Sequence, residues 1–170
     1  MPSARRADHH SPGAARRRAE LLDRRLVRAF PELRAALDGM AVLWDGETPG
    51  PHRVYADLFV RQVLLGLALE PGGGAVLRRA ARFLEAIVAS PEEDLADVAR
   101  YAVLENLLLE GGPEDRARLL AVAGPGTRRL AREVAGWWGV PLPRPPLALA
   151  LPGGGGRPPD PRVGPRAPDP

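Results

Sequence analysis

The chain has 170 residues, with 24 basic against 21 acidic side chains and a net charge of +3 at pH 7. All the basic residues are Arg and there is no Cys, which excludes a disulfide framework, a thiol nucleophile and a Cys-ligated zinc site. This length suits one domain with tails. The abundance of Arg, Ala, Gly and Pro is typical of coding in a high-GC, actinobacterial-like bacterium.

The positive charge lies mainly outside the central part of the chain. Residues 1–28 hold eight Arg against three carboxylates, a net charge of +5, and residues 140–170 have a net charge of +2. Residues 29–139 hold twelve Arg against sixteen carboxylates, a net charge of −4. The sequence pI near 10.4 therefore does not indicate a basic surface over the whole molecule.

No stretch of the sequence predicts a secretory signal or a membrane span. The most apolar run, Val63–Leu69, is far shorter than the ~18 residues that a transmembrane helix needs. Charged side chains interrupt the N-terminal region throughout. We therefore expect a cytoplasmic protein without a membrane partner.

The sequence predicts helices in chain order, each bounded by turn-forming residues. Ser90, Pro91 and Glu93 form a capping-box signature, which predicts a helix that begins at Pro91. Thr127 is expected to cap the last helix. The apolar spacing of three and four predicts helices over 15–30, 31–44, 54–70, 75–89, 91–110, 114–123 and 127–138.

No segment alternates with period two for long enough to predict a strand. We therefore predict an all-α fold: one domain over residues 15–139, built of six or seven helices as a HEAT-like or irregular bundle. Residues 1–14 lack any periodicity and are expected to be disordered. Residues 140–170 contain eleven Pro and a run of four Gly, which predicts a disordered tail.

Short aliphatic motifs between residues 29 and 139 carry a resemblance to a known class of domain. This segment resembles a bacterial all-helical domain of unknown function, similar in character to the HEAT-like immunity proteins of toxin systems. The resemblance implies a protein that neutralises its partner by binding it, and it carries no catalytic residue. The motifs are Pro31-Glu32-Leu33, Trp44-Asp45-Gly46-Glu47, Phe83-Leu84-Glu85, Val103-Leu104-Glu105 and Gly124-Pro125-Gly126-Thr127.

Two polar residues of the fifth predicted helix, Glu105 and Asn106, fall on or beside its apolar stripe and need hydrogen-bond partners. The first interpretation is structural: Glu105 ties neighbouring helices together through Arg82 or through backbone amides. The alternative pairs Glu85 with Glu105 as general acid and base. That alternative lacks a nucleophile, a metal-ligand set and a substrate loop.

The Trp residues are the candidates for partner binding. Trp137 and Trp138 point about 100° apart on a helix, so one face cannot easily bury both. Trp side chains that stay exposed are enriched at binding hot spots. Beside Trp44, Asp45 and Glu47 add an acidic loop that suits a basic partner, although a solvated helix-end turn is the plainer interpretation.

Nucleic-acid binding is the alternative function. The Arg-rich start of the chain can neutralise phosphates in a sequence-independent, salt-sensitive way, but it contains no interleaved aromatic residue. The residues concerned are Arg16, Arg17, Arg18, Arg24 and Arg25.

Neither a metal nor a cofactor is expected. The three His show no metal-ligand spacing, and the Gly-rich segments lack the Lys of a phosphate-binding loop. The sequence therefore predicts a non-enzymatic module that binds another protein, such as a toxin that it masks. A nucleic-acid-associated accessory protein is the alternative.

Overall fold

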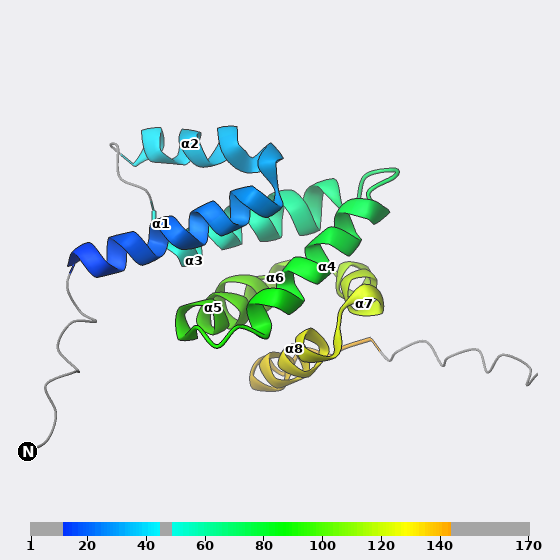
Figure 1. The fold of residues 1–170 in the computed structure, drawn as a ribbon. Coiled ribbons are helices and arrows are strands. Elements are labelled where there is room, and N and C mark those ends of the chain that lie inside the picture. The colour runs from blue at the N-terminus through cyan, green and yellow to red at the C-terminus, as the bar shows by residue number, and fades with distance from the viewer. Residues whose placement is uncertain (1–11, 45–48, 144–170) are drawn as a thin grey trace, which may run out of the picture.

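The computed structural model describes residues 12–44 and 49–143, and these residues form seven helices and no strand. The prediction of an all-α fold is confirmed. Figure 1 shows the order of the helices along the chain. They are α1 (Pro12–Ala29), α2 (Arg34–Leu43, entered through the 3₁₀ turn η2, Pro31–Leu33), α3 (Pro51–Val54, which continues as η3, Tyr55–Leu67), α4 (Gly74–Val88), the continuous helix α5, η4 and α6 (Glu93–Asp97, Val98–Leu104, Glu105–Glu110), α7 (Pro113–Val122) and α8 (Pro125–Trp138).

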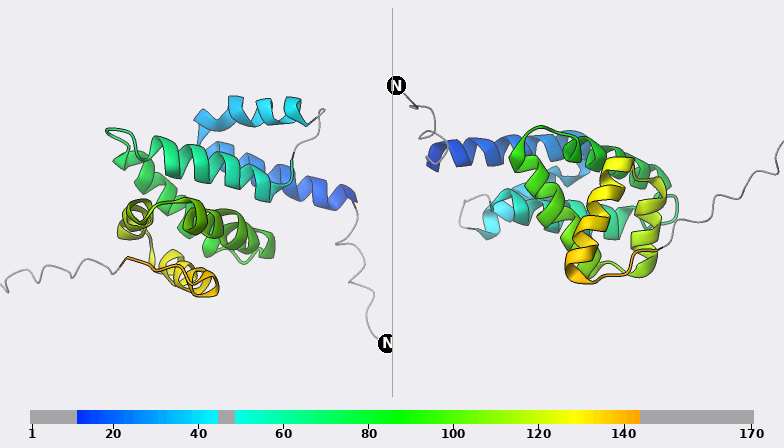
Figure 2. Two further views of the ribbon diagram at one scale, coloured as in Figure 1. Left: turned by 180° about the vertical axis from the view of Figure 1, so that it is seen from behind. Right: turned by 90° about the horizontal axis from the view of Figure 1, so that it is seen from below.

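The helices are stacked, and α4 is central to the stack. It packs against η3 on one side and against α7 and α8 on the other, while η4 lies between η3 and α8. Figure 2 shows α1 beside the α3–η3 helix, with α2 outside them and with α7 and α8 at the opposite end. Of the helices in the described residues, none is both long enough and apolar enough to span a bilayer.

Four aromatic rings hold α1, η3 and α4 together. Phe30, Tyr55, Phe59 and Phe83 have ring centroids 5.2–6.4 Å apart, and the first three are fully buried. The Tyr55 hydroxyl donates a hydrogen bond to the carbonyl oxygen of Leu22 at 3.0 Å. Because burial of large aromatic side chains is a major source of stability, this cluster makes α1 an integral part of the core.

The predicted ends of the folded part need correction at both termini. α1 begins at Pro12, inside the segment 1–14 that was expected to be disordered. After α8, Val140 and Leu142 still pack against the core, although the tail was expected to begin at residue 140. Residues 1–11 and 144–170 of the two predicted tails lie outside the described residues.

Two predicted helix caps are wrong. The helix expected from Pro91 begins at Glu93, because Ser90 accepts a hydrogen bond from the Glu92 amide at 3.2 Å and closes a turn before the helix. The last helix begins at Pro125 rather than after Thr127, which is buried inside its first turn. In both cases a local hydrogen-bonding signal identified the region correctly and placed the helix start two residues off.

The α3–η3 helix and the α5–η4–α6 helix are wider than an α-helix over part of their length. In η3 and η4 the backbone bonds span five residues: the Ala68 amide donates to the Val63 carbonyl at 2.9 Å, and the Glu105 amide donates to Arg100. Where α-helical pairing resumes after Glu105, the carbonyl of Tyr101 is skipped. The Asn106 side chain donates to this oxygen at 3.1 Å and to the Ala102 carbonyl at 3.0 Å.

Replacement of Asn106 by Ala is therefore expected to lower the free energy of unfolding by about 1 kcal/mol, because two hydrogen bonds are lost, the one to Ala102 being part-buried. Urea unfolding measures this loss. Gln62→Ala, at an exposed position of η3, is the control and is expected to change stability by less than about 0.5 kcal/mol. Equal losses in the two variants would contradict the role assigned to Asn106.

Candidate functional site

The carboxylate of Glu85, on α4, caps the beginning of α8. Its Oε1 accepts the Gly126 amide at 2.8 Å, and its Oε2 accepts the Thr127 amide at 2.8 Å and the Thr127 hydroxyl at 2.7 Å. The first amides of a helix lack intrahelical acceptors and carry partial positive charge. A side chain from a different helix thus supplies the cap that α8 lacks locally.

The Gly124-Pro125-Gly126-Thr127 motif is shaped to receive this carboxylate. A Cβ atom at Gly124 would lie 2.6 Å from Oε2 of Glu85, and one at Gly126 would lie 2.8 Å from Oε1. Burial raises the pKa of Glu85, but the bonds from Thr127 and Gly126 and the charge of Arg128 outweigh it and hold the pKa below its ordinary value. Gly124 and Gly126 therefore form an internal carboxylate-binding turn.

At the other end of α8, Trp137 joins an exposed aromatic surface. Its ring stacks on Tyr101 of η4, with centroids 6.4 Å apart and planes 25° apart. Tyr101, Trp137 and Trp138 are 44%, 52% and 52% exposed. The Arg100 guanidinium lies 5.5 Å from the Trp137 centroid, and its Nη2 pairs with Glu133 at 3.3 Å. We call Arg100, Tyr101, Trp137 and Trp138 the aromatic surface.

The sequence predicted that one of the two Trp residues would stay exposed, and the structure leaves both half exposed. It gave no prediction for Arg100 or Tyr101. Their position on the helix face turned toward α8 follows from the packing of η4 against α8, which no local pattern reveals.

Trp44 lies far from this surface. It follows α2, which sits on the opposite side of the molecule from α8 (Figure 1) and has Leu37 as its only fully buried residue. Val42 and Leu43 are 79% and 83% exposed, and Trp44 is 51% exposed. The predicted acidic loop residues Asp45 and Glu47 lie outside the described residues.

The predicted contact between Arg82 and Glu105 is wrong. Arg82 is exposed and Glu105 half-buried, and neither forms an ion pair or side-chain hydrogen bond with any described residue. The carboxylate that ties helices together through backbone amides is that of Glu85, while Asn106 supports the end of η4. Glu85 is thus occupied by the α8 amides, which does not favour its pairing with Glu105 as acid and base.

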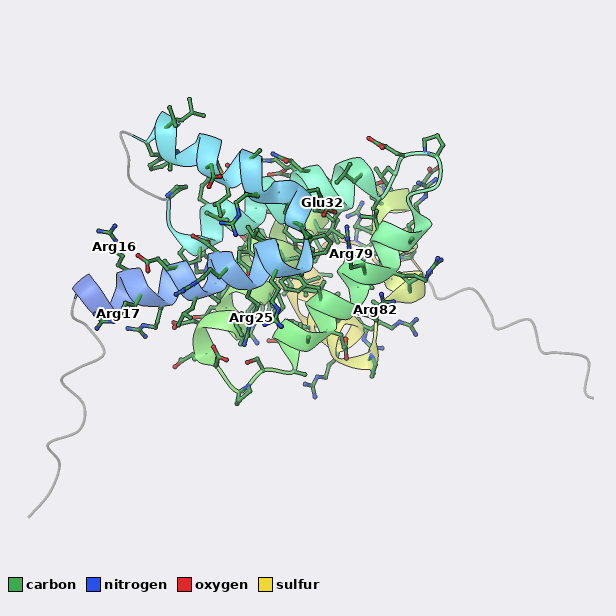
Figure 3. All side chains as sticks on the ribbon, turned by 45° about the horizontal axis from the view of Figure 1, so that its top comes forward. Arg16, Arg17, Arg25, Glu32, Arg79 and Arg82 are labelled. Atoms are coloured by element: carbon green, nitrogen blue, oxygen red, sulfur yellow. The ribbon has the colours of Figure 1, made fainter. Side chains whose placement is uncertain are left out.

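The arginines of the predicted nucleic-acid arm lie on a packed helix. Arg16 pairs with Glu20 at 3.3 Å, while Arg18 and Arg25 reach across to Asp94 and Glu92 at 3.5 and 3.3 Å. Arg17 and Arg24 are exposed on α1, and Figure 3 shows Arg16 and Arg17 at one end of α1 with Arg25 further along. Residues from Pro12 onward therefore do not form a free arm.

Asp23 is a buried carboxylate that the sequence did not single out. It is 6% exposed, and its Oδ1 has no hydrogen-bond partner among the described residues. Burial, reinforced by the negative charge of Glu20, raises the pKa of Asp23 to about 6. Burial and the negative charge of Asp23 also raise the pKa of Tyr55.

Within residues 12–44 and 49–143, no three His, Asp or Glu side chains group closely enough to hold a metal ion. Comparison with known proteins gives no match, whether to a family model, to a curated protein or to a solved structure. The resemblance to bacterial toxin-immunity domains therefore stays a prediction. The geometry shows an exposed aromatic surface on a helical domain.

Removal of the Glu85 charge is expected to weaken the contact between α4 and α8. Glu85→Gln should lower the free energy of unfolding by about 1.5–3 kcal/mol at pH 7, because charged hydrogen bonds are lost. The native pKa is depressed, so this stabilisation is present above about pH 4.5, the ordinary Glu value, and is lost as the pH falls through the native pKa. Denaturant unfolding at pH 7 and pH 3 measures both effects. Glu114→Gln, at an exposed position, is the control, and a pH-independent difference would contradict this interpretation.

Replacement of Asp23 by Asn is expected to stabilise the protein, whereas Glu85→Gln destabilises it. The native pKa of about 6 lies above the ordinary value of 3.8, so the native state loses stability as the pH rises between these values. Asp23→Asn should therefore raise the free energy of unfolding by about 2 kcal/mol at pH 7.5 and change it little at pH 4. Thermal unfolding of Asp23→Asn and of the exposed control Asp38→Asn at both pH values measures this; destabilisation at pH 7.5 would reveal an interaction made only by the charged carboxylate.

Proposed function

We propose that this chain is a non-enzymatic protein-binding module and that it docks its partner on the aromatic surface. The observation that carries the proposal is the stack of Tyr101 on Trp137, half exposed and fixed from the side by Arg100 and Glu133. Trp, Tyr and Arg are the residues most enriched at binding hot spots.

The side chains of the aromatic surface are held in place before a partner binds, which favours affinity. Arg100 is held between Glu133 and the Trp137 ring, and its Nε is buried without a partner. Side chains that are already fixed lose little conformational entropy on binding.

The charge along α8, the helix that carries Trp137 and Trp138, favours an acidic partner. The exposed side chains of α8 include Arg128, Arg129 and Arg132 against one carboxylate, Glu133. Complementary charge speeds encounter and fixes orientation. This preference concerns α8, whereas the basic partner expected from Asp45 and Glu47 rests on residues outside the described part.

Binding by such a surface acts through occlusion: the partner's own site is covered, with no chemical step. This is the mode implied by the resemblance to bacterial immunity domains, and a toxin masked by a cytoplasmic helical protein fits it. Glu85 has a structural part in this proposal, since it anchors α8 at the end opposite to Trp137.

The test uses the full chain as bait in lysate of the organism that encodes it, with mass spectrometry of what is retained. Wild type and the control Trp44→Ala are expected to retain the same protein, and Trp137→Ala at least tenfold less of it, because loss of a hot-spot side chain costs about 2 kcal/mol or more. All three proteins should show the same helical circular dichroism. Equal retention by Trp137→Ala would overturn the proposal that the aromatic surface is the interface.

A further inference from the structure

Apart from Arg16, which pairs with Glu20 within α1, the arginines of α1 and α4 fall into two groups. Arg18 and Arg25 on α1 and Arg79 on α4 form ion pairs with Asp94, Glu92 and Glu32 respectively, and these pairs tie helices together. A second group is exposed and forms no ion pair with any described residue. It consists of Arg17, Arg24 and Arg28 on α1 and Arg78 and Arg82 on α4.

The second group is arranged in rows. Arg17, Arg24 and Arg28 are seven and eleven residues apart, which places them within about 40° of one another on α1. Their row is about 16 Å long and lies away from the buried residues Leu22 and Leu26. Arg78 and Arg82 are four residues apart and likewise share one face of α4.

The end of α1 lies against α4, which brings the Arg28 end of the first row toward the second row. The Phe30 ring, directly after α1, meets Phe83 at 5.5 Å, and the Arg79 guanidinium lies 4.7 Å from the Phe30 centroid. Figure 3 shows Arg17 and Arg25 along α1 and Arg82 on the adjacent α4. We infer that these two rows form a phosphate-binding surface for the backbone of a double-stranded nucleic acid.

The composition of the surface decides between classes of polyanion. Its only large exposed apolar side chain is Leu21, whereas an interfacial membrane helix needs a broad apolar face. The aromatic residues nearby, Phe30 and Phe83, are core residues and cannot stack on bases. The surface therefore offers Arg guanidinium groups but no ring to stack on bases. Such groups suit the sequence-independent contacts that phosphates offer.

Like charges at this spacing also have a cost. Arg24 and Arg28 are four residues apart and repel each other along α1. A bound phosphate backbone would remove that repulsion. The inference does not rest on the proposed protein-binding function, because none of its residues belongs to the aromatic surface.

Fluorescence anisotropy with a labelled 20-base-pair duplex tests the inference on the full chain. Wild type is expected to bind with an affinity that falls steeply between 50 and 200 mM salt. The triple variant Arg17→Ala, Arg24→Ala, Arg28→Ala is expected to bind at least tenfold more weakly, with the salt slope reduced by about 3. The separate double variant Arg78→Ala, Arg82→Ala should reduce the slope by about 2.

The control removes the same charge elsewhere: Arg34→Ala, Arg118→Ala and Arg129→Ala, all exposed and without ion pairs to described residues. It is expected to lose less than threefold in affinity. If the control and test variants lose duplex affinity equally, the loss is a net-charge effect and the inference is overturned. Absence of duplex binding by wild type, or binding only to vesicles that contain anionic lipid, would also overturn it.

Discussion

The contact between the Glu85 carboxylate and the first turn of α8 is the constraint on which the candidate binding surface depends. α8 has no side-chain cap of its own, and its first amides are satisfied across the fold by a residue on α4. The same contact requires Gly at positions 124 and 126, since a Cβ at either would collide with the carboxylate. Because α8 is a single rigid helix, fixing its start also fixes the direction in which Trp137 and Trp138 leave its end.

α1 combines two roles that its sequence keeps on different faces. Leu22, Leu26 and Val27 are buried, and the Tyr55 hydroxyl bonds to the backbone of this helix. The opposite face presents arginines that no described carboxylate neutralises. Any truncation that removes residues 1–28 therefore also removes part of the core. The basic character of the chain cannot be separated from its fold by deletion, and charge substitutions on the exposed face are the cleaner perturbation.

Helix positions were predictable because apolar periodicity and Gly or Pro breaks are local signals. The all-α class followed from the same reasoning, and the helical angle between Trp137 and Trp138 predicted that one of them would stay exposed. The Ser90 cap failed because the same hydroxyl can close a turn or cap a helix, and the sequence does not distinguish the two. The Arg82–Glu105 pair failed since η4 shifts the angular positions that an ideal helical wheel assumes. Tyr101 was missed because its partner ring lies 36 residues away, and the register between η4 and α8 is set by tertiary packing.

The buried Asp23 is a destabilising group on the otherwise apolar buried face of α1, close to the junction between α1 and the start of α5. A carboxylate with an unpartnered oxygen opposes folding most when it is charged, and Asp23 lies on the buried side of α1 with Leu22, Leu26 and Val27. Arg25 and Arg18 do not neutralise it, because they pair with Glu92 and Asp94 instead. The ion pairs thus hold the start of α5 to α1 while leaving Asp23 isolated. Stability at this junction therefore comes from the four-ring aromatic cluster and the apolar face of α1, with charge deciding orientation rather than strength.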